Sequence, residues 1–338
     1  MNNQTSSLEF SHFPVMLNEV LKISTPSKGG NFIDCTFGGG NYSKEILNYP
    51  KTIVQGIDRD KKVLLRAKEL EKQFPNRFKF HQKKFSQLDT VLNNNVDVII
   101  FDLGLSSIQL NDLDRGFSFK SDKKLDMAMG INEISALEVI NNLEETELKL
   151  IIKILGDEKD ASRIAKNIVI ARSIRKIAKV NQLVDIIKKS KKRSYSEKIN
   201  PSTKTFQALR IFVNKEVTEL IEGIISATKV LKPGGKILVV SFHSIEDKII
   251  KYFFSNFSSN KSKPSRYIPY NVNTKSYLFS QYKNKIIKPS IEEINENPPS
   301  RSAKLRFAIR SSNNFFYPHE IVNKFKKYLD LESSYASF

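Results

Sequence analysis

Short apolar runs alternate with amphipathic, helical stretches over the first third of the chain. The runs cover residues 31–35, 52–57, 78–81 and 96–103 and are rich in β-branched and aromatic side chains, which is typical of strands. Residues 60–73, between the second and third runs, have helical spacing. This alternation predicts an α/β fold with a parallel sheet covered on both faces. Sheets of this kind bind ligands at the carboxyl ends of their strands.

The strand pattern lapses after residue 109 and returns later. Residues 134–192 have a helical pattern, in which four apolar side chains are spaced to form one buried face: Leu148, Ile151, Ile152 and Leu155. Strand patterns resume at 236–242, directly after a turn at 232–235 (KPGG), and again at 304–310. We therefore expect a first core part at 1–109, an inserted helical domain for RNA or substrate recognition at 110–204, a second core part at 205–312 and a C-terminal tail at 313–338.

The composition is that of a globular protein, since 40% of the 338 residues are hydrophobic and 27% are charged. Cys35 is the sole cysteine, so the chain has no intrachain disulfide and no cysteine-rich zinc site, which fits a reducing compartment. No apolar run approaches the roughly 18 residues of a membrane span, and the first residues lack the basic and apolar regions of a signal peptide. We expect a cytoplasmic protein with no membrane partner.

Positive charge is in excess and unevenly distributed. Lys and Arg number 55 against 36 Asp and Glu, a net charge of +19, which favours nucleic acid as a partner, although a uniformly lysine-rich surface is the alternative. Residues 159–204 hold 14 basic and three acidic residues, and residues 248–291 hold nine basic and no acidic ones. Aromatic residues are interleaved with the basic ones in the second stretch, and six of them are candidates for base stacking: Phe253, Phe254, Tyr267, Tyr270, Tyr277 and Tyr282. Both stretches are candidates for RNA contact, with solvated surface as the alternative.

A glycine-rich turn follows the first predicted strand. The segment DCTFGGGNYS spans residues 34–43, and its glycines at 38–40 let the backbone approach a ligand closely. Asp58 ends the next predicted strand, where an acid can accept hydrogen bonds from the ribose hydroxyls of an adenosine. Ser43 replaces the third glycine of a dinucleotide fingerprint, and no P-loop pattern is present. S-adenosylmethionine remains as the expected adenosine ligand. The alternative is that the glycines are only structural and that Asp58 is an ordinary surface aspartate.

The fourth predicted strand runs into FDLGLSSIQL, residues 101–110. Asp102, Ser106, Ser107 and Gln109 supply donors and acceptors at the sheet edge, where the reacting part of a cofactor would lie. A capped strand-to-helix turn uses the same residue types and is the alternative.

Further motifs stand in order along the chain: HFPVMLNEV from residue 12, GIDRD from 56, DRGFSFK from 114, LDMAMG from 125, TFQALRIFVN from 205, SFHSIEDKI from 241 and RSAKLRFAIR from 301. Together with the two motifs above they run nearly end to end. On these residues the chain resembles the bacterial 16S ribosomal RNA (cytosine-N(4)) methyltransferases of the RsmH or MraW type.

The resemblance implies a Rossmann-like, S-adenosylmethionine-dependent methyltransferase core with an inserted helical domain. The implied reaction is methylation of the exocyclic N(4) amine of one cytidine in the decoding region of 16S ribosomal RNA, within the small ribosomal subunit; a homodimer stays open. The family's cofactor contacts fall on seven residues here: Gly39, Gly40, Asn41, Asp58, Phe85, Asp102 and Gln109. Asn41 replaces the usual histidine but still donates and accepts hydrogen bonds, and Ile108 replaces a proline, which only relaxes the loop.

For the reaction we expect positioning to matter most. Ser106 is the expected hydrogen-bond acceptor of the cytosine amine, with backbone carbonyls of the same loop as the alternative, and Asp102 acts on the cofactor, the amine or both. His243 stays unassigned. The four histidines lack metal-type spacing, so no metal is expected. Two other classes stay open at this point: a nicotinamide oxidoreductase, and an RNA-binding assembly factor without catalytic activity.

Overall fold

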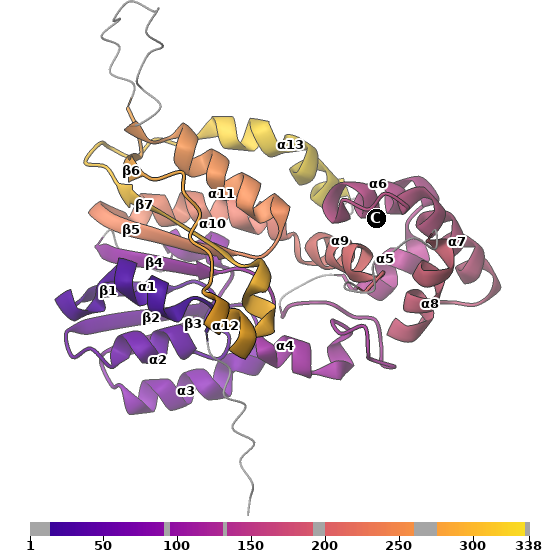
Figure 1. Cartoon of the computed structure of the whole chain (residues 1–338), viewed down its shortest axis with the longest axis horizontal. Coiled ribbons are helices and arrows are strands. Elements are labelled where there is room, and N and C mark those ends of the chain that lie inside the picture. The colour runs from indigo at the N-terminus through magenta and orange to yellow at the C-terminus, as the bar shows by residue number, and fades with distance from the viewer. Residues whose placement is uncertain (1–13, 91–94, 131–133, 192–199, 260–275, 335–338) are drawn as a thin grey trace, which may run out of the picture.

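A computed structural model describes residues 14–90, 95–130, 134–191, 200–259 and 276–334 of the chain. Its sheet has seven strands in the order β3-β2-β1-β4-β5-β7-β6, and a group of helices lies beside the sheet (Figure 1). The strands are β1 (Gly30–Asp34), β2 (Thr52–Asp58), β3 (Phe78–Gln82), β4 (Val96–Asp102), β5 (Leu231–Ser241), β6 (Phe279–Tyr282) and β7 (Lys304–Arg310). The fold is a Rossmann-like α/β fold, as the sequence predicted.

The sheet is mixed rather than wholly parallel, so the prediction of a parallel sheet is wrong at one edge. Strands β1 to β5 pair in parallel, whereas β7 pairs antiparallel with β5, and β6 pairs antiparallel with β7. Antiparallel edge strands are common on parallel sheets. Strand β6 was not predicted, because it is only four residues long and lies in the stretch that we interpreted as a basic aromatic surface.

The predicted turn at 232–235 lies inside β5. Val96 of β4 pairs with Leu231, and Val98 pairs with Lys236, so residues 232–235 form an irregular bulge between two paired positions. Gly234 in this bulge has a φ of 79°, a value that favours glycine. The turn residues were recognised correctly, but they interrupt a strand instead of preceding it.

Side chains on the central strands alternate between two apolar cores, one on each face of the sheet. On β4, Ile99 and Phe101 belong to one core and Val98 and Ile100 to the other, and all four are buried. A strand covered on both faces needs apolar residues at successive positions, which explains the four consecutive apolar residues at 98–101. The core that contains Phe101 continues into the helices beside the sheet.

The helices described are α1 (Leu17–Ser24), α2 (Asn41–Leu47), α3 (Leu64–Gln73), α4 (Ser107–Asn111), α5 (Ala136–Asn142), α6 (Glu145–Gly156), α7 (Ala161–Ile174), α8 (Val180–Ser190), α9 (Thr203–Asn214), α10 (Glu216–Val230), α11 (Ser244–Asn256), α12 (Ile291–Glu296) and α13 (His319–Ser333). Helices α5 to α9 form the group beside the sheet (Figure 1). The four predicted core positions of α6 are all buried. The predicted domain boundaries at 109, 204 and 312 remain a prediction.

Helix α13 lies within the segment that we predicted as a C-terminal tail. It packs against α10 and α11, and also against α6 and α9 of the helical group, so it connects the two parts of the molecule (Figure 1). Ile321 and Phe325 are its buried apolar anchors. In the part of the chain that is described, none of the helices has both the length and the apolar character that a membrane crossing requires.

Candidate functional site

A cleft opens at the carboxyl ends of β1 and β4, where the strand order reverses, which is where sheets of this type bind ligands. With the open solvent at its mouth included, the cleft holds about 780 Å³ of space. Five of the predicted site residues line it: Asp58, Phe85, Asp102, Ser106 and Gln109. The remaining lining comes mainly from the turn after β1 and from the first turns of α10 and α11.

A hydrogen bond joins the glycine turn to the end of β2. The backbone N–H of Gly38 donates to Oδ2 of Asp58 at 2.8 Å. Gly38 has a φ of 49°, and a Cβ there would lie 3.3 Å from Cβ of Ser106. Glycine at this position therefore permits the left-handed turn and leaves the cleft wall free of a side chain. Gly38 lines the cleft, although the family resemblance pointed to the residues after it.

Gly39, Gly40 and Asn41 lead into α2 and are not among the residues that line the cleft. Gly40 has a φ of 74°, and a Cβ there would come within 2.6 Å of the ring of Phe37. This glycine therefore has a packing role that any side chain would disturb. Contact of these three residues with a cofactor stays a prediction.

Asp58 has room for further hydrogen bonds. Its Oδ1 accepts from the N–H of Asp60 at 2.8 Å, and its Oδ2 accepts from Gly38. A carboxylate has about four acceptor positions, so one on each oxygen remains for a ligand. Burial raises the pKa of Asp58, while the two backbone hydrogen bonds oppose that rise. The geometry is suited to accepting hydrogen bonds from two neighbouring hydroxyls.

Asp102 carries a buried oxygen with no hydrogen-bond partner in the described structure. Its own N–H donates to Oγ1 of Thr36 at 2.7 Å, but Oδ1 of its side chain is unpaired. Burial raises the pKa of Asp102 well above its usual value, and the carboxylates of Asp34 and Glu246 raise it further. Since unpaired buried carboxyl oxygens are costly, this atom indicates that the cleft receives a donor or a cation.

Ser106 and Gln109 form a capping box at the start of α4. Oγ of Ser106 accepts from the N–H of Gln109 at 3.3 Å, and Oε1 of Gln109 accepts from the N–H of Ser106 at 3.0 Å. Nε2 of Gln109 donates to Asp60 at 3.2 Å. The capped-turn interpretation is therefore confirmed, while both residues also line the cleft. A catalytic role for Ser106 and a cofactor contact for Gln109 stay predictions.

Phe85 forms an aromatic wall of the cleft. Its ring packs edge-on against Phe101 with centroids 5.5 Å apart. Gly223 of α10 lies against the ring, since a Cβ there would come within 2.5 Å of it. These contacts hold Phe85 in place, and its ring is half-buried. The position suits stacking or edge contact with a flat ligand.

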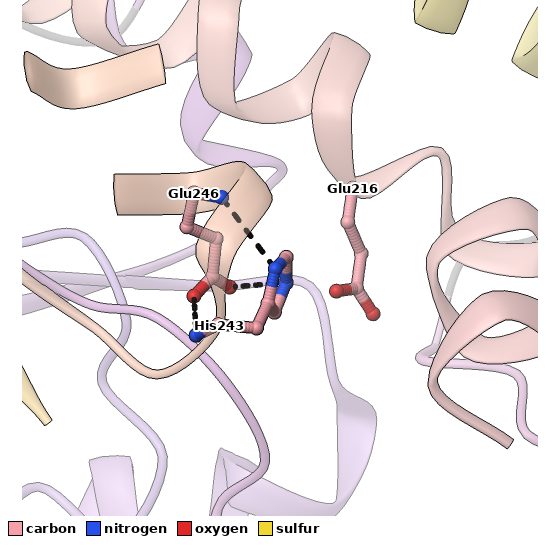
Figure 2. A group of neighbouring side chains, drawn as sticks. All are labelled: Glu216, His243 and Glu246. Carbon is pink, nitrogen blue, oxygen red and sulfur yellow. Dashed lines mark hydrogen bonds and ion pairs between the residues drawn. The ribbon is translucent and has the colours of Figure 1, made fainter. Parts of the chain in front are cut away.

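Three further polar side chains lie close to one another, two of them, Glu216 and Glu246, lining the cleft and the third, His243, beside them. Glu216 begins α10, and His243 and Glu246 form the capping box of α11 (Figure 2). Each could offer one ligand atom to a metal ion, and these atoms lie within 4.8 Å of one another. The three residues come from distant parts of the sequence, so no local spacing revealed them.

Two contacts join His243 and Glu246. Nδ1 of His243 accepts from the N–H of Glu246 at 3.5 Å, and Nε2 lies 3.0 Å from Oε1 of Glu246 (Figure 2). Burial alone would raise the pKa of Glu246, but His243, Arg210 and the N–H of Phe242 outweigh it and lower the pKa.

Helix α13 fixes the first turn of α10. Glu332 accepts hydrogen bonds from the N–H of Val217 at 2.9 Å, and from the N–H and the hydroxyl of Thr218 at 2.8 and 2.6 Å. Burial raises its pKa from 4.5 to about 7, against the effect of these bonds. Because Glu216, Glu219 and Leu220 of this helix line the cleft, the C-terminal helix positions part of the cleft wall.

The predicted RNA-contact stretches are described only in part. Residues 192–199 and 260–275 lie outside the described residues, and with them Lys192, Arg193, Tyr267 and Tyr270. Lys188 and Lys189 are exposed at the end of α8 and can reach a phosphate backbone. Lys191 is instead buried beside Glu158, with Nζ and Oε2 2.7 Å apart, so it is part of the protein interior.

Three of the six aromatic residues proposed for base stacking are buried, so that prediction is wrong for them. Phe253 and Phe254 lie on the inner face of α11 and pack edge-on against Phe279 of β6, at 5.5 and 5.3 Å between ring centroids. Tyr282 is buried with them. The aromatic residues here stabilise the core over the edge of the sheet, a role that the sequence pattern did not distinguish from RNA contact.

The sequence profile of the MraW methylase family matches residues 9–311. The chain belongs to the MraW methylase family. Ribosomal RNA small subunit methyltransferase H of Ehrlichia canis is 44% identical over 304 residues, which cover 88% of this chain and 99% of that protein. The protein of the same name from Bartonella bacilliformis is 43% identical, covering 89% of this chain and 90% of that protein.

Among solved structures, an rRNA methylase from Streptococcus thermophilus is similar to 86% of this chain and 95% of its own, with a TM-score of 0.35 and 9% identity. Membership in the MraW family confirms the resemblance drawn from the sequence motifs. The nicotinamide oxidoreductase is therefore set aside.

Proposed function

We propose that this MraW-family protein transfers the methyl group of S-adenosylmethionine to the exocyclic N(4) amine of one cytidine in the decoding region of 16S ribosomal RNA. Its substrate is the small ribosomal subunit, in the cytoplasm. The names of its relatives, ribosomal RNA small subunit methyltransferase H, support ribosomal RNA as the substrate class. The single observation that carries the proposal is the unpaired buried oxygen of Asp102 in a cleft next to Asp58.

The hydrogen-bond acceptors, charges and aromatic surface of the cleft fit S-adenosylmethionine. Asp58 has acceptor positions left for two ribose hydroxyls. Asp102 offers an unpaired oxygen to a positively charged group, and S-adenosylmethionine has both an ammonium and a sulfonium. Five acidic residues line the cleft (Asp58, Asp102, Glu216, Glu219 and Glu246) against three basic ones (Arg59, Lys83 and Lys84), a balance that favours a cationic ligand over a pyrophosphate. Phe85 supplies an aromatic surface for the adenine.

The protein's own task is to position the acceptor amine. S-adenosylmethionine supplies an already activated methyl group when bound. The lone pair of a cytosine amine is delocalised into the ring, so an acceptor that binds the amine hydrogens helps to localise it on nitrogen. Ser106 is the residue that we assign to this contact, because its capping bond to Gln109 fixes Oγ at the cleft. Asp102, with its raised pKa, is the second candidate in the same cleft.

The test is incubation of the protein and labelled S-adenosylmethionine with small-subunit particles that lack the modification, followed by nucleoside analysis. We expect label in N(4)-methylcytidine, and a loss of roughly 10- to 100-fold in rate for Asp102→Asn, about what a lost charged hydrogen bond costs. Asp89→Asn is the matched control, since Asp89 pairs with Lys229 outside the cleft. Label in another nucleoside would contradict the proposed chemistry, and tight RNA binding without transfer would indicate an assembly factor. Sedimentation of the purified chain decides whether it forms a homodimer.

A further inference from the structure

A second cavity lies beside the cleft and has no role in the proposed function so far. It holds about 450 Å³ of space with the open solvent at its mouth included, and Phe117, Phe119 and Phe206 are among the residues that line it. The rings of Phe119 and Phe206 meet edge-on with centroids 5.0 Å apart. Its polar lining comes from one face of α9, where Thr203, Gln207 and Arg210 follow helical spacing.

The second cavity meets the cleft at two places. Leu105 lines the second cavity, while its neighbours Gly104 and Ser106 line the cleft. Arg210 lines the second cavity, while Glu216 lines the cleft, and the two side chains are joined by two hydrogen bonds. Nε and Nη2 of Arg210 donate to Oε1 and Oε2 of Glu216, each at 2.8 Å. A flat ligand in the second cavity would therefore face the cleft across this ion pair.

The ion pair is largely withdrawn from solvent, but not all of its hydrogen-bonding positions are occupied. Both side chains are only 14% exposed. A guanidinium has five N–H groups, so among the residues that the structure describes three remain on Arg210 beyond the two that Glu216 accepts, and each Glu216 oxygen keeps a lone pair. A desolvated ion pair of this kind is costly unless further hydrogen bonds complete it. The structure thus presents an acceptor beside donors, at the boundary between an aromatic cavity and the cleft.

We propose that the second cavity receives the unstacked cytosine ring of the substrate and that Arg210 and Glu216 recognise its edge. This rests on the proposed function, which makes a cytidine the substrate. The edge of cytosine carries an amine donor next to two acceptors, N3 and O2. Glu216 accepts from the amine and Arg210 donates to the acceptors. The phenylalanines contact the faces of the ring, as aromatic side chains do around extruded bases.

The same arrangement rejects uracil. Uracil has a carbonyl in place of the amine and an N–H in place of N3, so Glu216 would face an oxygen and Arg210 would face a donor. A site that hydrogen-bonds its ligand discriminates strongly against a mismatch, because its buried polar groups are left unpaired. Since Glu216 also lies among the cleft residues, a cytosine bound this way presents its amine toward Ser106 and Asp102.

The test uses the full chain and two readouts. Ligand-observed NMR with cytidine 5′-monophosphate (CMP) and uridine 5′-monophosphate (UMP) measures base binding, and methylation of unmodified small-subunit particles gives kcat and KM. We expect the wild-type protein to bind CMP in preference to UMP. Arg210→Lys keeps the charge but loses the planar fork, Glu216→Gln loses the second acceptor, and Phe119→Leu loses the ring. Each should abolish the CMP preference and lower kcat/KM by roughly 10- to 100-fold.

Matched controls separate the cavity from folding. Arg77→Lys and Phe74→Leu change a half-buried arginine and phenylalanine outside both cavities, and they should keep the wild-type CMP preference and kcat/KM. Calorimetry should show S-adenosylmethionine bound by Phe119→Leu within a factor of two of wild type, which reports a folded cleft. Equal CMP and UMP binding by the wild type, or wild-type kinetics in the three cavity variants, would overturn the assignment. N(4)-methylcytidine as the product would then leave the proposed function standing, whereas another product would overturn that function itself.

Discussion

The backbone N–H of Gly38 donates a 2.8 Å hydrogen bond to the carboxylate of Asp58. The turn that follows β1 and the acid that ends β2 are therefore one unit, although they are 20 residues apart. This bond places the bare backbone of the turn and the acceptor oxygens of Asp58 along the same wall of the cleft. Two substitutions test this unit from its two sides.

Asp58→Ala should weaken S-adenosylmethionine binding by about 1 to 3 kcal/mol, because it removes charged hydrogen bonds to the ribose. The affinity of Asp58→Asn for S-adenosylmethionine should lie between those of Asp58→Ala and the wild type, since one side-chain oxygen of the asparagine can still accept a hydrogen bond. Isothermal calorimetry measures both. Unchanged affinity in Asp58→Ala would remove the ribose role from this residue.

Gly38→Ala should also weaken cofactor binding, by about 1 to 2 kcal/mol or more. The alanine would have a φ of 49° and would place its Cβ 3.3 Å from Ser106, so it strains the turn and enters the cleft wall. Gly234→Ala is the matched control: its φ is 79°, and a Cβ there meets nothing within 4 Å. Both variants should lose stability in denaturant titrations, but only Gly38→Ala should lose affinity. Equal affinity in the two variants would argue against the turn as a cofactor wall.

The central parallel strands and the glycine turn could be predicted because they depend on local patterns. The apolar run of β4 reflects burial on both faces, and the glycines at 38 and 40 both have positive φ. The group of Glu216, His243 and Glu246 could not be predicted, because it depends on how α10 and α11 pack at the sheet edge. The same holds for Phe253 and Phe254, whose burial is decided by the unpredicted strand β6.

Stability should depend on the protonation of Glu332. Its pKa is raised from 4.5 to about 7 in the folded protein, so the folded state holds the proton more tightly than the unfolded chain. The stabilisation is complete below about pH 4.5 and is lost as the pH rises through about 7, with a total on the order of 3 kcal/mol.

Chemical denaturation of the wild type and of Glu332→Gln at several pH values from 5 to 8 isolates this contribution. The glutamine cannot ionise, so the wild type should lose stability relative to the variant as the pH rises. Parallel pH profiles of the two proteins would show that Glu332 does not titrate in this range.

Lys188 and Lys189 should contribute to RNA affinity through phosphate contacts. Changing both to Gln should weaken binding to small-subunit RNA and reduce the slope of log affinity against log salt concentration by about one to two. Lys68 and Lys72, exposed on α3, provide a control pair of equal charge on the other part of the molecule. If the two double variants have the same slope, the end of α8 does not face the RNA.

A crystal structure of the protein with S-adenosylmethionine is the most direct test of the proposed cofactor site. We expect the ribose hydroxyls within hydrogen-bond distance of Asp58, the adenine beside Phe85 and a positively charged group of the ligand on the unpaired oxygen of Asp102. A ligand bound outside this cleft, or bound in it with Asp58 and Asp102 untouched, would show that the site lies elsewhere.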